Sequence, residues 1–157
     1  MRDDRKRIWG WYFFDWASQP FNTLLLTFVF GPYFAAVASD AFAAQGADPQ
    51  AADAQAQAMW STALAVIGLI IGLSAPVMGA IADTSGRRIP WIAGFSVMAV
   101  IGAFGVWGTL PDGSNLWWGL VFFGIAFMGA ELGFIFTNSL LPGLTTAEER
   151  GKVSGTG

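Results

Sequence analysis

Four long intervals of this chain carry either no charged residue or a single one. They are residues 8–39, 54–82, 89–111 and 113–147. The second and third hold no charge, whereas Asp15 is the one charged residue of the first and Glu131 that of the fourth. Because about 20 apolar residues cross the hydrocarbon core of a bilayer as a helix, each interval is long enough to span it. We therefore predict an all-α, integral membrane bundle with four transmembrane helices, at about 12–38, 58–82, 90–110 and 116–140.

Composition supports a membrane protein and excludes several kinds of catalytic site. Of the 157 residues, 54% are hydrophobic and only 12% are charged, a smaller charged share than soluble domains have. The chain has no cysteine and no histidine, which excludes disulfides, thiol catalysis, His-based triads and zinc sites built on these residues. It also has no P-loop pattern. We therefore expect no enzyme activity, no metal, no cofactor and no nucleic-acid partner, and we expect a lipid bilayer around the helices.

The basic residues predict the orientation of the helices. Every Lys and Arg lies before the first span, between the second and third, or after the fourth: Arg2, Arg5, Lys6, Arg7, Arg87, Arg88, Arg150 and Lys152. The other connecting segments carry only acidic charges. Since cytoplasmic loops hold the excess of Lys and Arg, we predict a multi-pass protein of the cell membrane with the N-terminus, the loop 83–89 and the tail 141–157 in the cytoplasm. The segment 39–57 is then an exterior loop, which we expect to be partly helical.

A secretory signal peptide is the alternative interpretation of the first span. Residues 36–39, "AVAS", resemble a small-residue cleavage site. However, the uncharged stretch 16–39 is longer than the roughly 7–15 residues of a typical signal-peptide core, and an aspartate beside tryptophans is unusual there. A transmembrane helix is therefore the favoured interpretation.

Small residues and prolines predict how the helices pack and bend. Small residues recur four apart in the second and fourth spans, as Gly68 and Gly72, Ala75 and Gly79, and Gly129 and Gly133. Such pairs let helix backbones approach closely in lipid. Pro20 and Pro32 in the first span and Pro76 in the second each remove a backbone donor, so we expect these two spans to be kinked or locally broken. The turn "LPDGSN", 110–115, predicts that the third and fourth spans are antiparallel neighbours.

The loop between the second and third spans carries the most specific local pattern. The stretch "GAIADTSGRR", residues 79–88, resembles the G-x-x-x-D-x-x-G-R-R signature between helices two and three of the major facilitator superfamily of transporters. In physical terms, Gly79 permits close packing, Asp83 places a charge at the membrane edge, and Gly86 allows the turn. Arg87 and Arg88 hold the loop at the inner interface.

The resemblance implies that this loop is a conformational latch, in which Asp83 engages the opposite half of the transporter. Many members of the superfamily have a basic residue directly after this aspartate, whereas this chain has Thr84. The difference removes the basis for an ion-pair role at that position. The alternative interpretation of the loop is a charged turn that only fixes the topology of the helices.

Three further stretches are similar to the vacuole-effluxer branch of that superfamily, the autophagy-related proteins with many bacterial relatives. They are "YFFDWASQPFNTLLLTFVFGPYF" in the first span, "NSLLPGL" at the end of the fourth, and "ERGKVSGTG" at the end of the chain. The resemblance implies a protein of about twelve helices, of which this chain is the N-terminal portion and whose missing C-terminal helices are its partner. It also implies a small-molecule solute, and fungal members are linked to amino-acid export from the vacuole.

Two acidic residues within the spans are the candidates for transport chemistry. Asp15, Gln19 and Asn22 have the spacing of one helix face, and so have Glu131 and Asn138. Both acids lie on the order of 10–15 Å from the cytoplasmic boundary, at 1.5 Å per residue. Because an ionised acid in hydrocarbon costs roughly 2.5–3.5 kcal/mol, we expect both to face a transport path, where one of them couples proton movement to solute movement.

Each acid also has a purely structural interpretation. Asp15 is alternatively an anchor at the end of a helix, within an interfacial belt of aromatic residues formed by Trp9, Trp11, Tyr12 and Trp16. Glu131 is alternatively the acceptor of a structural hydrogen bond from a neighbouring helix.

Secondary active transport of a small solute, coupled to protons, is the function that the sequence favours, with amino-acid efflux as the implied case. The alternative is a four-helix membrane scaffold or assembly protein without transport activity, and an intramembrane hydrolase ranks third. The gene sequence beyond Gly157 discriminates the first two interpretations. A further apolar helix soon after that residue supports the transporter, and an immediate stop supports the scaffold.

Overall fold

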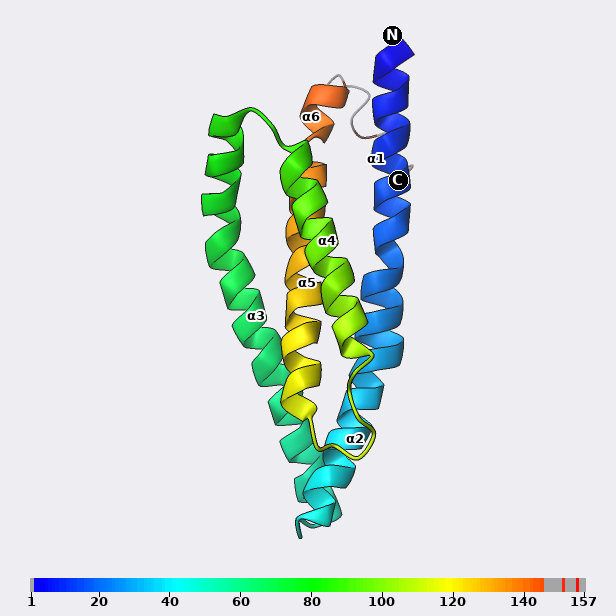
Figure 1. Ribbon diagram of the computed structural model, residues 1–157, viewed down its shortest axis with the longest axis vertical. Coiled ribbons are helices and arrows are strands. Elements are labelled where there is room, and N and C mark those ends of the chain that lie inside the picture. Colours follow the sequence, from blue (N-terminus) through cyan, green and yellow to red (C-terminus); the bar gives the residue numbers. More distant parts are fainter. Residues whose placement is uncertain (1, 146–150, 152–154, 156–157) are drawn as a thin grey trace.

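The computed structural model describes residues 2–145, Gly151 and Gly155, and the regular elements among them are helices. They are α1 (Arg2–Pro20), the π-helix η1 (Phe21–Phe30), α2 (Gly31–Ala44), α3 (Pro49–Ser85), α4 (Ile89–Val106), α5 (Leu116–Asn138) and α6 (Leu141–Leu144). Most of the expected cytoplasmic tail 141–157 lies outside the described residues. The long helices form one elongated bundle (Figure 1).

Four helical stretches are long and apolar enough to cross a membrane: Lys6–Ala44, Pro49–Thr84, Ile89–Val106 and Leu116–Leu144. They confirm the predicted all-α bundle with four membrane spans, the first of which joins α1, η1 and α2. The segment 39–57, expected as an exterior loop, is helical except for the turn 45–48. Asp48 starts α3 there, because its carboxylate accepts a hydrogen bond from the Ala51 N–H at 3.1 Å and caps the helix.

The charged residues gather at opposite ends of the bundle. The N-terminus, the loop between α3 and α4, and α6 lie at one end, the upper end in Figure 1. We call it the basic end, because Arg7, Arg87 and Arg88 lie there. The turn from α2 to α3 and the connection from α4 to α5 lie at the opposite, acidic end, with Asp48 and Asp112.

Aromatic rings fill the centre of the bundle at two levels. The larger cluster joins η1, α2, α3 and α5 through Phe30, Phe34, Trp60 and Phe123. Its contacting rings have centroids 4.8–6.1 Å apart, a range in which aromatic pairs stabilise a core beyond simple burial. Nearer the basic end, Phe95 of α4 and Phe136 of α5 form a second contact, with centroids 5.2 Å apart.

Helices α4 and α5 approach most closely where small residues face a backbone. A Cβ atom added at Gly129 would lie 2.5 Å from the Ala99 nitrogen and 2.7 Å from the Phe95 oxygen. One added at Gly102 would overlap the backbone of Ala126. The close helix approach predicted at Gly129 is thus confirmed, and its partner is α4.

The glycines of α3, unlike those at the α4–α5 contact, are not packed against another described helix. Within the described part of the chain, no atom outside the adjoining backbone of α3 itself lies within 4 Å of a Cβ added at Gly68, Gly72 or Gly79. These glycines therefore lie on a side of α3 that the other described helices leave uncovered. The close packing expected along this side of the second span is not formed by the described residues.

The first span changes its geometry between its two prolines. It is α-helical up to Pro20, π-helical from Phe21, and α-helical again from Gly31 onward. Proline has no backbone N–H and so cannot continue the α-helical ladder, and a π-helix bonds each residue to the fifth one away. The prediction of a local break is therefore confirmed in this span. In contrast, α3 continues as an α-helix through Pro76 and curves gently (Figure 1).

A hydrogen-bonded turn connects α4 to α5. The carboxylate of Asp112 accepts bonds from the backbone N–H and the hydroxyl of Ser114, at 3.0 and 2.8 Å, and these bonds lower the pKa of Asp112 below its ordinary value. Gly113 between them takes a positive φ of 71°, which favours glycine. The turn reverses the chain, so that α4 and α5 are antiparallel neighbours as predicted (Figure 1).

Candidate functional site

A polar contact joins the first span to the fourth. The side-chain amide of Asn22 donates a hydrogen bond to Oε1 of Glu131, with 3.4 Å between nitrogen and oxygen. Asn22 is the second residue of η1, and Glu131 lies about 10 Å along the axis of α5 from the end of that helix at Asn138. The Glu131 side chain is half-buried and that of Asn22 is exposed. Two residues predicted to line one path, 109 positions apart, are thus in contact.

Asp15 is buried against the other helices, with only 6% of its surface exposed. Among the residues that the structure describes, its carboxylate receives no hydrogen bond and makes no ion pair. No fully buried side-chain oxygen in the described part of the chain lacks a hydrogen-bond partner. The unbonded Asp15 oxygens are therefore not fully buried and keep a small accessible surface. One turn earlier, the indole N–H of Trp11 donates to the Thr137 carbonyl at 3.2 Å. This bond fastens α1 to the end of α5.

The other predicted path residues are less closely associated. Gln19 is exposed, and Asn138 is half-buried at the end of α5. No hydrogen bond or ion pair between described residues links Asp15 to Glu131. Asn22 belongs to the π-helix, in which one turn contains more residues than a turn of an α-helix. The α-helical spacing that predicted Asp15 and Asn22 on one helix face therefore does not apply beyond Pro20.

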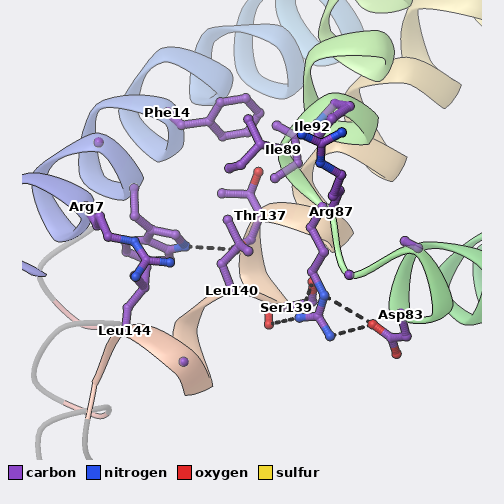
Figure 2. A pocket seen from close by; sticks show the side chains of 17 residues that line it. Arg7, Phe14, Asp83, Arg87, Ile89, Ile92, Thr137, Ser139, Leu140 and Leu144 are labelled. Atoms are coloured by element: carbon purple, nitrogen blue, oxygen red, sulfur yellow. Dashed lines mark hydrogen bonds and ion pairs between the residues drawn. The ribbon is translucent and has the colours of Figure 1, made fainter.

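The loop between α3 and α4 is fastened to α5 by Arg88. The Arg88 guanidinium donates to Oδ1 of Asp83 from Nε at 3.1 Å and from Nη2 at 2.5 Å. Its third nitrogen, Nη1, donates to the hydroxyl of Ser139 at 3.1 Å and to the Ser139 carbonyl. Figure 2 labels Asp83 and Ser139 and draws these contacts between them as dashed lines. Arg88 thus binds Asp83 and Ser139 at the same time. Among the described residues, Oδ2 of Asp83 has no hydrogen-bond partner.

The predicted roles of the loop glycines differ. Gly86 ends α3 with a positive φ of 63°, and its N–H donates to the Asp83 carbonyl at 3.3 Å. The turn expected at Gly86 is therefore confirmed. At Gly79 the described helices provide no close neighbour. Arg87 lines the pocket beside the loop.

The surface of the described helices includes two pockets that bear on the candidate site. The larger, about 1010 Å³, opens at the basic end between α1, the α3–α4 loop, the end of α5 and α6 (Figure 2). The smaller, about 550 Å³, is an apolar groove between α3 and α5 that includes Met59, Ile67 and Met128. Neither pocket is lined by Asp15 or Glu131.

Comparison with protein-family models identifies the family of this chain. The family model described as vacuole effluxer Atg22 like matches residues 3–154. The chain belongs to this family. The Atg22-like match extends from α1 to α6 and so includes Asp15, Asn22, Glu131 and the loop at Asp83. No curated protein and no solved structure matches the chain.

Membership of the Atg22-like family supports a function in membrane transport. The family description names an effluxer, and the four membrane-length helices agree with a multi-pass membrane protein in a lipid bilayer. The family thus favours a transporter over an enzyme.

Replacing Arg88 with Ala is expected to destabilise the protein. The substitution removes the bonds from Arg88 to Asp83 and Ser139. Hydrogen bonds to charged groups contribute about 1.5–3 kcal/mol, and solvent screening lowers this at a partly exposed site, so we expect a loss of about 1–2 kcal/mol. Thermal unfolding of the detergent-solubilised protein measures the effect. Arg88→Lys, which keeps the charge but lacks the fork, should recover only part of it. An Arg88→Ala variant as stable as the unmodified protein contradicts this role.

Proposed function

We propose that the chain belongs to a proton-coupled secondary transporter, with Glu131 and Asn22 on its transport path. The observation that carries the proposal is the contact between Asn22 and Glu131 within two apolar helices. An ionised carboxylate costs roughly 2.5–3.5 kcal/mol at the centre of a membrane helix. A hydrogen bond to a charged group contributes about 1.5–3 kcal/mol at good geometry, and the 3.4 Å bond from Asn22 is longer than usual, so this single bond does not offset that penalty. Glu131 therefore needs water, a proton or a cationic solute.

The same argument extends to Asp15. It is buried in the first span, and no described basic side chain pairs with it. A carboxylate in this position attracts either a proton or the ammonium group of a solute. An amino acid carries such an ammonium group, which supports amino acids as the solute class. The word effluxer in the family description supports export as the direction of transport.

The loop at Asp83 is proposed to act as a conformational latch. Both described bonds from Arg88 go to Oδ1, so that Oδ2 remains available to a further donor. The nearby face of α3 with Gly72 and Gly79 is uncovered by the described helices. We infer that further helices of a major-facilitator-type protein pack on this face and engage Asp83 in one conformation.

The basic end is proposed to face the cytoplasm of a cell membrane. Arg7, Arg87 and Arg88 lie at this end, and the acidic end of the described chain carries Asp48 and Asp112. Lys and Arg accumulate in cytoplasmic loops, which supports this orientation.

A membrane scaffold without transport activity is the second candidate. The Asn22–Glu131 bond is compatible with a scaffold, because a hydrogen bond of this kind can serve simply to hold two helices together. In a scaffold this contact serves only to hold the first span against α5, and no solute crosses the membrane.

Flux through proteoliposomes distinguishes the two candidates. The full-length product of the gene is reconstituted, and uptake of each of the twenty amino acids is measured with and without an imposed pH gradient. Transport predicts that at least one amino acid accumulates only under the gradient, in contrast to liposomes without protein. The absence of gradient-driven accumulation for all twenty contradicts proton-coupled amino-acid transport and favours the scaffold.

A further inference from the structure

The π-helix η1 turns two aromatic residues toward the same neighbour. Phe21, at its start, stacks on Phe127 of α5 with ring centroids 6.4 Å apart. Phe30, at its end, stacks on Phe123 of α5 at 5.5 Å. The distance in sequence from Phe21 to Phe30 makes about 2.5 turns of an α-helix, which would place them on opposite faces. A π-helix holds more residues in each turn, so that both rings face α5.

Burial within η1 follows the same long repeat. The residues of η1 that are buried or half-buried are Phe21, Leu25, Leu26 and Phe30, and the others are exposed. Their spacing is longer than the 3.6 residues of an α-helical turn. In an α-helix counted back from Phe30, Thr23 would face α5 in place of Phe21. The side on which Thr23 lies therefore reports which form the segment takes.

The π form also sets the position of Asn22. This residue directly follows Phe21, and its side chain bonds Glu131 while Phe21 packs on α5. Phe30 is fixed by the buried aromatic cluster. If the segment between them were α-helical, Phe21 would turn away from α5 and Asn22 would turn with it. The Asn22–Glu131 hydrogen bond would then be lost.

Gly31 permits the π form where η1 joins α2. A Cβ atom added at Gly31 would collide with the carbonyl oxygen of Leu26, five residues earlier. Five residues is the hydrogen-bonding separation of a π-helix, whereas an α-helix uses four. Since the colliding atom belongs to the backbone, it cannot move aside without a change in the helix. Alanine is otherwise the most favourable residue in an α-helix, so Gly31→Ala should favour the α form over the π form.

Thr27 makes a contact across the wide turn of η1. Its hydroxyl donates a hydrogen bond to the carbonyl oxygen of Asn22 at 2.9 Å. In an α-helix a threonine hydroxyl reaches the carbonyl three or four residues earlier, whereas this acceptor lies five residues earlier. The bond thus holds the backbone of the residue that contacts Glu131.

We propose that Gly31 and Thr27 are positioning residues, which hold η1 in the π form and thereby place Asn22 against Glu131. Gly31 leaves room for the Leu26 carbonyl, and Thr27 ties the backbone of Asn22. Their role in transport rests on the proposed function, in which Asn22 and Glu131 lie on the path. Their effect on the form of the helix does not.

Distances between spin labels test the form of the helix independently of transport. The full-length protein is used, with any cysteines beyond this chain replaced. One label is attached at Thr23→Cys, and the other at Val97→Cys of α4 or Leu69→Cys of α3, which are exposed positions. In Gly31→Ala, residue 23 should turn from the exposed side of η1 to the side that faces α5. We expect at least one of the two distances to change by about 5 Å or more, since a helix is about 10 Å wide.

Control variants assign the change to the π-helix. Gly10→Ala adds the same methyl group to the first span, where no described atom outside the adjoining backbone lies within 4 Å, and should leave both distances unchanged. Thr27→Val keeps the shape of the side chain without the hydroxyl, and should move part of the population to the distances of the α form. Thr27→Ser keeps the hydroxyl and should not. If Gly31→Ala does not fold, Thr27→Val decides the outcome.

A double-mutant comparison tests the role in transport. Asn22→Ala alone should lower gradient-driven accumulation at least threefold, whereas in Gly31→Ala, where the contact is already absent, it should cause no further loss. Equal effects of Asn22→Ala in the two backgrounds overturn the positioning role, and so do label distances that Gly31→Ala leaves unchanged. Absence of accumulation in the unmodified protein contradicts the proposed function instead, and the label distances then decide whether Gly31 holds the π form.

Discussion

Replacing Glu131 with Gln is expected to abolish the dependence of solute transport on a pH gradient. Glutamine has nearly the same shape and still accepts the Asn22 hydrogen bond through its amide oxygen, but it cannot release a proton. Net accumulation under an imposed gradient should fall at least tenfold. Exchange of labelled for unlabelled solute should persist, because it requires no net proton movement. Both rates are measured in proteoliposomes with the full-length protein.

Matched variants separate Glu131 from Asp15. Glu131→Asp keeps an ionisable group and should retain part of the gradient dependence, whereas Asp15→Asn tests the other buried acid of the path. If Asp15 binds the ammonium group of the solute, its removal should raise KM and slow exchange as well as accumulation. Unchanged gradient dependence in both Glu131→Gln and Asp15→Asn contradicts proton coupling through these groups.

Replacing Gly129 with Ala is expected to cause a large loss of stability for the addition of a single methyl group. The added Cβ would lie 2.5 Å from the Ala99 nitrogen and 2.7 Å from the Phe95 oxygen, both of which belong to the backbone of α4. Since a backbone cannot move aside as a flexible side chain does, α4 and α5 must separate. Overpacking of this kind costs typically about 1–3 kcal/mol, and we expect the upper part of this range.

Gly72→Ala is the matched control for this substitution. It adds the same methyl group to a membrane helix, but no described atom outside the adjoining backbone of α3 lies within 4 Å of it. Thermal unfolding in detergent should show a clear decrease for Gly129→Ala and a change near zero for Gly72→Ala. Equal unfolding temperatures for the two variants contradict the close packing of α4 on α5. A large decrease for Gly72→Ala instead indicates that another part of the protein packs on α3.

The sequence predicts four membrane-length helices, because lipid imposes a simple rule, although α1 and α3 begin earlier in the chain than the predicted spans, at Arg2 and Pro49. A membrane span tolerates few charges, so the clustered charges near Arg7, Asp83, Arg88 and Asp112 indicate where the apolar stretches end. Local geometry is harder to predict. The prolines indicate a break in the first span, but not that residues 21–30 form a π-helix. Nor does the four-residue spacing of glycines indicate that Gly129 is packed while Gly72 is uncovered.

The candidate site was predictable in part. The polar residues Asn22 and Glu131 stand out because the spans around them are apolar, and the structure joins them. The bond from Arg88 to Ser139 was not predicted, because it links positions 51 residues apart whose contact depends on how α5 ends. The Trp11–Thr137 bond was missed for the same reason, and because its acceptor is a backbone carbonyl, which no residue type marks in the sequence.

Water access to residue 22 is the most direct measure of whether these polar residues line a transport path. The chain has no native cysteine, so Asn22→Cys introduces a single thiol into the described span. Val97→Cys, at a position 58% exposed in the apolar helix α4, is the lipid-facing control. A charged, membrane-impermeant thiol reagent applied to both membrane faces should label residue 22 at least tenfold faster than residue 97. Equally slow labelling at the two positions contradicts a wet passage at Asn22 and Glu131.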